Sequence, residues 1–248
     1  MPIPNEVMPD PGGERPLVRG VDGCPAGWIA VTIAATGPLT PCVTITRDFA
    51  ELTTGVEKIA VDMPIGLPER AGPGGRGAEG AARAILGGRK SSVFSVPSRS
   101  AVYATDYDEA CRLAQASSDP PRKISKQAFF LFPKIRQIDL LLRGDAALAA
   151  VVFETHPEVA FWRANSGVPM LFPKSKPEGL RERRDLLESL GFDRAFLVAP
   201  VEWGAKRDDF LDACICALVA RRLHDGTARS FPDPPGHDAH GLPVAIWA

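Results

Sequence analysis

Three apolar segments of this chain end in a carboxylate, and a fourth begins with a pair of them. Asp22 ends LVRGVD, Asp62 ends EKIAVD and Glu154 ends VVFE, while Asp209 and Asp212 lie in DDFLDACICALVARR. A carboxylate at the end of a buried strand costs free energy unless something pairs with it. Several that meet at one sheet edge repel one another unless a cation neutralises them. The pattern therefore predicts a divalent-metal site built on a sheet, which suits phosphoryl-transfer chemistry.

The periodic apolar segments predict an order of strands and helices. Three short β-rich runs come first, a short helix follows, and EKIAVDMPIG has the apolar character of a fourth, central strand. We expect helices at Ala78–Leu86 and Tyr107–Ala116 and a long helix kinked at Pro133. AAVVFE is the fifth strand, RDDFLDACICALVARRLHDG is the last long helix, and PVAIW is a candidate terminal strand. The order predicts an α/β fold, in which helices flank a mixed five-stranded sheet and a helical insertion separates strands four and five.

Length and composition limit the class of protein. The chain has 248 residues and 45% hydrophobic residues, which suits one large α/β domain. We predict a disordered leader at residues 1–16 and a single domain at 17–248. No apolar stretch reaches the roughly 20 residues of a membrane span, and the leader lacks the basic start and apolar core of a signal peptide. Five scattered cysteines without a CxxC pair are typical of a reduced protein, so we expect a cytoplasmic protein without a membrane partner.

Positive charge is concentrated in the insertion. The formal net charge of −1 gives no general attraction to nucleic acid, but residues 67–137 contain twelve Lys or Arg against six Asp or Glu. A basic insertion beside an acidic metal site suits a phosphate-bearing ligand, although a solvated basic surface explains the charge equally well. The candidates to hold substrate phosphates are Ser92, Arg99, Lys126, Lys134 and Arg136.

Each carboxylate also has a purely structural interpretation. Asp22 and Asp62 can cap turns at the ends of their strands. Glu154 is harder to explain in this way, because Glu is depleted in strands and the residues before it are apolar. Asp209 and Asp212 share one helix face, and acidic groups in a first helical turn are favoured by the helix dipole. Small apolar residues surround Asp212, however, which indicates a face that packs against the sheet.

His156 also lies next to this group of segments. It begins HPEVAFW, two residues after the strand that ends in VVFE. A single histidine at such a position is either a metal ligand or a residue that caps and packs the start of a helix. We favour the capping role.

Six motifs together resemble the family of domains of unknown function numbered 429. In chain order they are GVDGCPAGWIAV, IAVDMPIGLPE, RKSSVFSVPSR, SKQAFFLFPKIRQID, FETHPEVAFW and DDFLDACICALVARR. The resemblance covers about Val18 to Leu223, and the family is grouped with predicted nucleases of the ribonuclease H-like fold. It implies a ribonuclease H-like sheet with Asp22 on the first strand, Asp62 on the fourth and Glu154 on the fifth. Asp209 and Asp212 would lie on the closing helix.

The insertion departs from the family pattern at one place. The family commonly carries Arg-x-x-Asp before an Ala-Arg pair, whereas this chain reads RGAEGAAR. Glu79 therefore either takes the place of that Asp or leaves its contact unmade.

The favoured function is a metal-dependent hydrolase, a nuclease or phosphoesterase that acts on a nucleic-acid or nucleotide phosphodiester. We expect two Mg²⁺ or Mn²⁺ ions about 4 Å apart, held by Asp22, Asp62, Glu154 and one of Asp209 and Asp212. One alternative is an actin-like ATP-dependent phosphotransferase, because GVDGCPAGW loosely resembles a first phosphate loop, although a second glycine-rich loop is missing. The other is a non-catalytic scaffold in which the carboxylates only cap turns.

Overall fold

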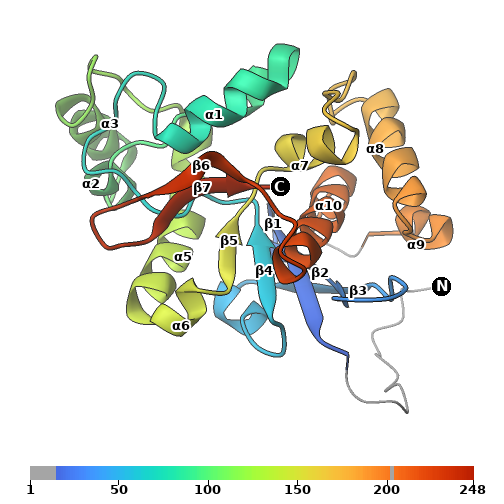
Figure 1. Cartoon of the computed structure of the whole chain (residues 1–248). Coiled ribbons are helices and arrows are strands. Elements are labelled where there is room, and N and C mark those ends of the chain that lie inside the picture. The colour runs from blue at the N-terminus through green and yellow to red at the C-terminus, as the bar shows by residue number, and fades with distance from the viewer. Residues whose placement is uncertain (1–14, 202–203) are drawn as a thin grey trace. The chain divides into compact units, whose positions relative to one another are not determined.

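Five strands form a mixed sheet in the order β3-β2-β1-β4-β5 (Figure 1). The strands are β1 (Leu17–Cys24), β2 (Gly27–Ala34), β3 (Cys42–Thr46), β4 (Lys58–Val61) and β5 (Val152–Glu154). β1 pairs antiparallel with β2, and β2 pairs antiparallel with β3. On its other edge β1 pairs parallel with β4, which in turn pairs parallel with β5. The predicted α/β class with a five-stranded mixed sheet is therefore confirmed.

The computed structural model describes residues 15–201 and 204–248, and the chain divides into two compact units. The first unit holds the sheet and contains the described residues up to Asp62, Val151–Ala228 and Trp247–Ala248, while Met63–Ala150 and Arg229–Ile246 form the second. Nearly all of the leader predicted at residues 1–16 lies outside the described residues. A single domain at 17–248 stays a prediction.

Helix α10 covers one face of the sheet in the first unit, where it packs against β1, β2 and β4 (Figure 1). The approach is close because Gly20 of β1 has no side chain: a Cβ there would lie 2.0 Å from the backbone nitrogen of Ala217. On the opposite face Trp28 of β2 packs edge-on against Phe49, with 5.1 Å between ring centroids. The helices of this unit are η1 (Phe49–Leu52), α7 (Pro157–Ala164), α8 (Pro177–Ser189), α9 (Arg194–Val198) and α10 (Arg207–His224).

The second unit is mostly helical and contains most of a small two-stranded sheet of β6 (Ser230–His237) and β7 (Pro243–Trp247), of which only the last residue of β7 belongs to the first unit. The predicted terminal strand PVAIW is β7. The predicted long helix is instead two helices, because Pro133 occupies the first turn of the second one, where its missing N–H costs no hydrogen bond. The helices are α1 (Gly77–Leu86), η2 (Gly87–Ser92), α2 (Arg99–Val102), α3 (Tyr107–Ala116), α4 (Lys126–Phe129), α5 (Phe132–Gly144) and α6 (Ala146–Ala149).

A buried ion pair fixes the start of α1. Arg76 Nη2 lies 2.5 Å from Glu79 Oε1, and the backbone N–H of Arg76 donates to Glu79 Oε2 at 2.6 Å. Arg76 Nη1 also donates to the carbonyl oxygens of Ile65 and Gly66, at 2.6 and 2.9 Å. The glutamate that stands where the related family commonly has Asp therefore does contact its arginine, and the pair joins α1 to the segment that follows β4.

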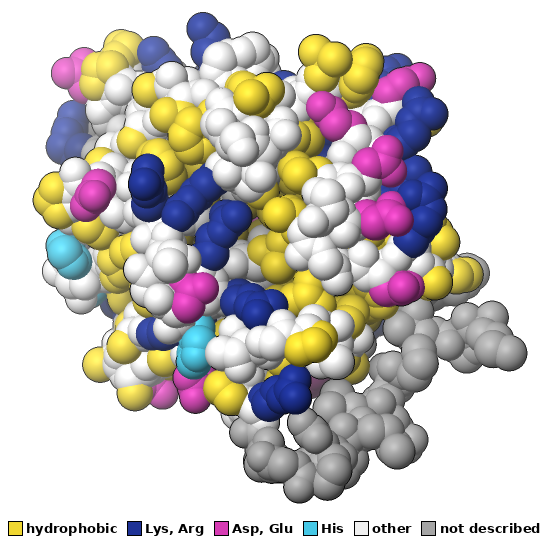
Figure 2. All heavy atoms as spheres, turned by 45° about the vertical axis from the view of Figure 1, so that its right-hand side comes forward, with side chains coloured by type: hydrophobic (Ala, Val, Ile, Leu, Met, Phe, Trp, Pro, Cys, Tyr) yellow, Lys and Arg dark blue, Asp and Glu magenta, His cyan; other side chains and the backbone are white. Residues whose placement is uncertain are grey.

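The face of the molecule drawn in Figure 2 is mixed in character. On the face drawn in Figure 2, basic, acidic and hydrophobic side chains are interspersed, in keeping with the formal net charge of −1. None of the helices in the described ranges is both long enough and apolar enough to cross a membrane.

Candidate metal centre

Three of the predicted carboxylates come together in the first unit. Asp22, Asp62 and Asp212 each offer an oxygen atom, and these atoms all lie within 4.8 Å of one another. Strand register brings the first two side by side: Val21 pairs with Val61 at the end of β4, so the residues that follow them, Asp22 and Asp62, are neighbours. Asp212 lies in α10, the helix that packs against these strands. A group of hard oxygen ligands at this spacing can hold a divalent metal ion.

Burial makes the group electrostatically costly without a cation. Asp212 is fully buried, and burial raises its pKa to about 7 although the ammonium of Lys174 acts in the opposite direction. The pKa of Asp22 is raised well above its ordinary value, first by burial and then by the negative charges of Asp62 and Asp212. Burial likewise raises the pKa of Asp62, against the opposing effects of His156 and Lys174. Each carboxylate therefore favours a proton or a metal ion over an uncompensated charge.

The two oxygens of Asp212 have different surroundings. Oδ2 accepts a hydrogen bond from Lys174 Nζ. Oδ1 is buried and has no hydrogen-bond partner within the described part of the chain. Buried polar atoms are normally satisfied, so a buried oxygen without a partner, on a carboxylate that lies close to two others, is the kind of atom that a metal ion would coordinate. The residues present therefore fit a divalent cation.

Lys174 completes the centre, and it could not be predicted from the sequence. It comes from the segment between α7 and α8, and its side chain is 38% exposed whereas that of Asp212 is buried. Burial lowers the pKa of Lys174, but the charges of Asp212, Asp22 and Asp62 and the hydrogen bond to Asp212 outweigh this effect and raise it. The ammonium thus neutralises part of the charge of the three carboxylates. Charge balance predicts some cation here, but it does not say which lysine.

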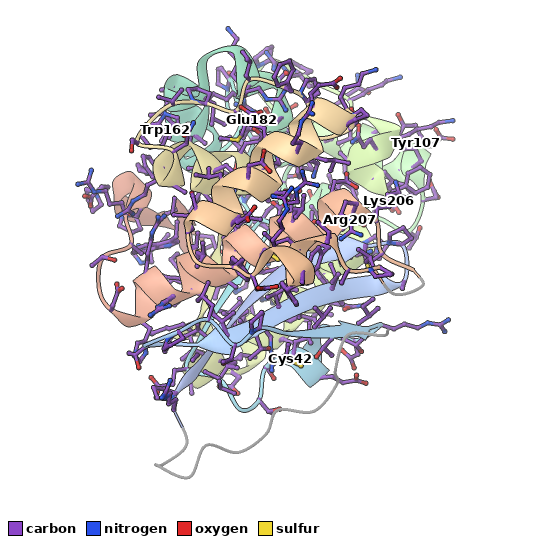
Figure 3. The ribbon with its side chains drawn as sticks, turned by 90° about the vertical axis from the view of Figure 1, so that its right-hand side faces the viewer. Cys42, Tyr107, Trp162, Glu182, Lys206 and Arg207 are labelled. Atoms are coloured by element: carbon purple, nitrogen blue, oxygen red, sulfur yellow. The ribbon has the colours of Figure 1, made fainter. Side chains whose placement is uncertain are left out.

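The segment that carries Lys174 is firmly attached to α8. Glu182, labelled on α8 in Figure 3, accepts hydrogen bonds from the backbone N–H groups of Leu171 and Phe172, at 2.8 and 3.1 Å. Arg183 Nη1 donates to the carbonyl oxygen of Phe172 at 3.0 Å, and its Nη2 pairs with Glu158. Arg183 and Glu158 are both buried. These contacts hold the backbone just before Lys174 in a defined position.

Asp209 and His156 have capping roles. Asp209 accepts a hydrogen bond from the backbone N–H of Lys206 at 3.0 Å, at the start of α10. His156 precedes α7, and its Nδ1 accepts the backbone N–H of Glu158 at 3.2 Å. Of the two acidic candidates on α10, it is therefore Asp212 that joins the carboxylate group.

Glu154 is not part of the group of three, although it lies at the end of β5 as expected. It pairs with Val61, the last residue of β4, which directly precedes Asp62. Successive side chains of a strand point to opposite faces, so this register directs Glu154 to the face away from Asp62. The sequence located the strand end correctly but could not show this one-residue offset.

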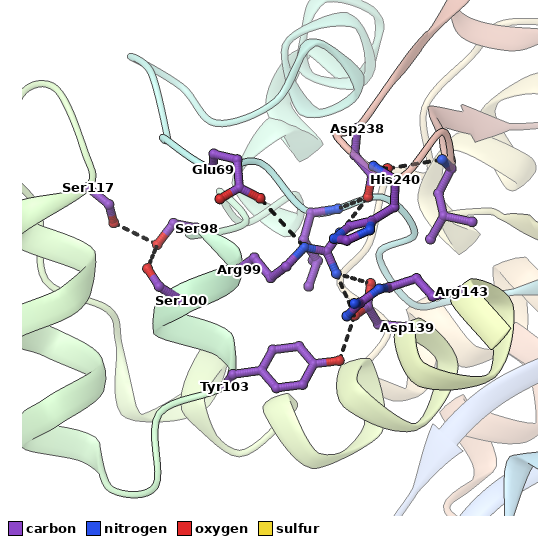
Figure 4. A network of polar contacts seen from close by, with 12 residues as sticks. Glu69, Ser98, Arg99, Ser100, Tyr103, Ser117, Asp139, Arg143, Asp238 and His240 are labelled. Atoms are coloured by element: carbon purple, nitrogen blue, oxygen red, sulfur yellow. Dashed lines mark hydrogen bonds and ion pairs between the residues drawn. The ribbon is translucent and has the colours of Figure 1, made fainter.

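Arg99 belongs to a network inside the second unit (Figure 4). Its side chain is largely buried, with Nη1 2.5 Å from Asp139 and Nη2 2.5 Å from Asp238. Tyr103 donates a hydrogen bond to Asp139 at 2.6 Å, and burial together with that hydrogen bond raises the pKa of Tyr103 to about 12. The guanidinium proposed to hold phosphate is therefore already paired with two carboxylates. Its evident role is to join α2, α5 and the turn after β6.

The other four proposed phosphate-binding residues also lie in the second unit. The hydroxyl of Ser92 donates to a backbone oxygen within η2, and Arg136 donates to the carbonyl oxygen of Ala104 at 3.1 Å. The ammonium of Lys126 lies 6.0 Å from the centre of the Tyr107 ring. Substrate contacts by these residues and by Lys134 stay predictions.

Fold and site together define an α/β protein with a buried acidic centre fit for a divalent metal. The family model described as "Protein of unknown function (DUF429)" matches residues 20–237, and the chain belongs to that family. Comparison with curated proteins and with solved structures gave no significant match.

Proposed function

We propose that the protein is a hydrolase that uses Mg²⁺ or Mn²⁺ to cleave a phosphodiester, with a nucleic acid or nucleotide as substrate. The observation that carries the proposal is the group of Asp22, Asp62 and Asp212, in which one buried carboxylate oxygen lacks a partner among the described residues. An all-carboxylate set of ligands suits Mg²⁺ or Mn²⁺ better than zinc. When bound, such an ion supplies Lewis-acid activation of water and of the phosphoryl oxygen.

The sheet supports the same proposal. Three antiparallel strands followed by two parallel ones, in the order β3-β2-β1-β4-β5, are what we expect of a ribonuclease H-like nuclease. In such a sheet the acidic residues lie at the end of the first strand and at the end of its parallel neighbour. Asp22 and Asp62 have these positions, and the helix that carries Asp212 closes the site.

The chain's own residues hold and orient the reacting groups. The backbone N–H of Gly23 donates to Asp22 Oδ1 at 2.6 Å and so limits the rotation of that carboxylate. Asp212 lies on a helix whose backbone packs directly against the backbone of β1 at Gly20, which helps to hold this carboxylate in place. Fixed ligands of this kind lower the reorganisation that a reaction requires.

The test compares the wild-type protein with Asp22→Asn. Binding of Mn²⁺ at 100 times its Kd should stabilise the wild-type fold by about 2.7 kcal/mol, seen as a rise in melting temperature. Hydrolysis of bis(4-nitrophenyl) phosphate and of labelled oligonucleotides should need Mg²⁺ or Mn²⁺ and stop in EDTA. Asp22→Asn should lose both effects.

Asp185→Asn is the matched control, because Asp185 lies on α8 with a side chain that is 54% exposed. This variant should keep the metal-induced rise in melting temperature and the hydrolysis of both substrates. If neither Mg²⁺ nor Mn²⁺ raises the melting temperature of the wild-type protein, the result would contradict the metal centre and favour a non-catalytic scaffold. A rise without hydrolysis of either phosphodiester would leave the metal centre standing and contradict the proposed reaction.

A further inference from the structure

We propose that the centre holds a single divalent ion and that Lys174 takes the place of a second one, contacting the leaving oxygen of the substrate. This inference rests on the proposed function and adds a catalytic residue to it. It replaces the two-ion site expected from the sequence with one ion and one ammonium group.

The charges of the centre balance with one divalent ion. Asp22, Asp62 and Asp212 carry three negative charges when ionised, and the ammonium of Lys174 pairs with the last of them. One divalent cation neutralises the two charges that remain. The other buried cation of this region, Arg183, is itself paired with Glu158. A second divalent ion would bring excess positive charge into a buried site.

The hydrogen bond between Lys174 and Asp212 also favours a single ion. Oδ2 of Asp212 accepts the hydrogen bond from Lys174, which leaves the orphan Oδ1 for a metal. A second ion bridged by Asp212 would have to displace the ammonium from Oδ2. Glu154, the fourth carboxylate expected for a pair of ions, is outside the group. The described residues thus supply one set of metal ligands and one fixed ammonium beside it.

Lys174 is placed to touch a substrate. Its side chain is partly exposed, whereas Asp212 beneath it is buried, so a phosphate that approaches the carboxylates from solvent meets the ammonium as well. An ammonium has three N–H donors, of which Asp212 engages one. Glu182 and Arg183 fix the backbone just before Lys174. The ammonium group is therefore already in position before a substrate binds.

The proposed step is a hydrolysis in which Lys174 stabilises developing charge. The oxygen of the attacking water bonds to phosphorus while that water gives one proton to solvent. The P–O ester bond breaks and its electron pair goes to the leaving oxygen, which accepts a hydrogen bond from Lys174 and then takes up a proton from solvent. A second metal ion would otherwise stabilise that oxygen.

The first experiment measures Mn²⁺ binding without any turnover. Calorimetric titration of the wild-type protein should give one ion per chain, and electron paramagnetic resonance should show an isolated Mn²⁺ rather than two coupled ions. Lys174→Met removes a positive charge beside the ion and should tighten binding by about tenfold or more. Lys174→Arg keeps the charge and should bind like the wild type. Lys176→Met, an exposed lysine two residues away, is the control and should also bind like the wild type.

The second experiment measures hydrolysis with two leaving groups. An oligonucleotide has an alkoxide leaving group and needs stabilisation, whereas 4-nitrophenolate is stable by itself. Lys174→Met should slow oligonucleotide cleavage by about 100-fold, and it should slow hydrolysis of bis(4-nitrophenyl) phosphate much less. Lys176→Met should leave both rates unchanged. If Lys174 only supported the fold, Lys174→Met would slow hydrolysis of the two substrates to the same extent and would not tighten Mn²⁺ binding.

The outcomes separate this inference from the proposed function. Two coupled Mn²⁺ ions in the wild-type protein, or weaker Mn²⁺ binding by Lys174→Met, would overturn the role of Lys174 and leave a metal-dependent hydrolase intact. Equal losses on both substrates would overturn its action at the leaving oxygen. A wild-type protein that binds no Mn²⁺ would overturn both proposals.

Discussion

Asp212 illustrates at the scale of one residue how function and stability conflict in this protein. Its carboxylate is buried with two others, and its folded-state pKa is raised to about 7 against about 3.9 in an unfolded chain. Between these values the folded state holds a proton that the unfolded state has released. The free energy of unfolding without metal should therefore fall as the pH rises from about 4 to about 7. Lys174 does not change this slope, because it is protonated in both states throughout that range.

Asp212→Asn should remove the contribution of this residue to the pH dependence of the free energy of unfolding. In EDTA at pH 8 we expect the variant to be more stable than the wild type by about 1 to 3 kcal/mol, and at pH 5 the difference should shrink. Urea unfolding at the two pH values measures both, with Asp185→Asn as the control. A variant that is less stable than the wild type at pH 8 would show that the ionised carboxylate is a net stabiliser, contrary to this account.

The positions and roles of some site residues could be predicted from the sequence, whereas those of others could not. The inward position of Asp212 was predictable, because small apolar residues follow it and only a face packed on the sheet explains them. Asp209 shares a helix face with Asp212 three residues away, and only the hydrogen bond from Lys206 shows that Asp209 caps the helix. Lys174 could not be found, since its position depends on how an irregular segment is anchored to α8.

At the scale of elements, the site depends on how closely α10 approaches β1. A Cβ on Gly20 would lie 2.0 Å from the backbone nitrogen of Ala217 and 2.3 Å from the backbone oxygen of Ala213. Neither atom can move without moving the helix. The glycine thus sets the distance between Asp212 on the helix and Asp22 on the strand.

Gly20→Ala should push α10 off the sheet and cost about 3 kcal/mol of the free energy of unfolding. It should also weaken Mn²⁺ binding, because the carboxylates separate. Gly80→Ala is the matched control: Gly80 lies within α1 with open space around its Cα, and alanine there should stabilise by about 0.5 to 1 kcal/mol. The free energies of unfolding of both variants are measured by urea unfolding. An unchanged stability of Gly20→Ala would mean that the helix does not lie this close.

Local patterns predicted the elements of the first unit better than those of the second. The five strands of the sheet and the last helix follow from apolar periodicity and from turn residues. The sequence does not predict β6, because SFPDPPGH contains three prolines. A proline has no N–H to donate to a neighbouring strand, so it is normally found only in edge strands. Pro133 predicts a kink in one long helix, whereas in the structure it lies in the first turn of a second helix.

At the scale of the whole molecule, the chain builds two compact units from interleaved segments. The order of elements indicated an insertion between strands four and five, because the apolar pattern changes from strand-like to helical after EKIAVDMPIG. The sequence did not show that residues 229–246 join the inserted segment in the second unit, since pairing between distant segments leaves no local signal. The same limit hid the register offset of Glu154.

The measurement that tests the central claim most directly is an anomalous difference map from a crystal soaked in millimolar Mn²⁺. We predict one peak about 2.1 Å from carboxylate oxygens of Asp22, Asp62 and Asp212, with Oδ1 of Asp212 among its ligands. The ammonium of Lys174 should remain on the other oxygen of Asp212. A map with no peak among these three carboxylates would contradict the metal centre on which the account depends.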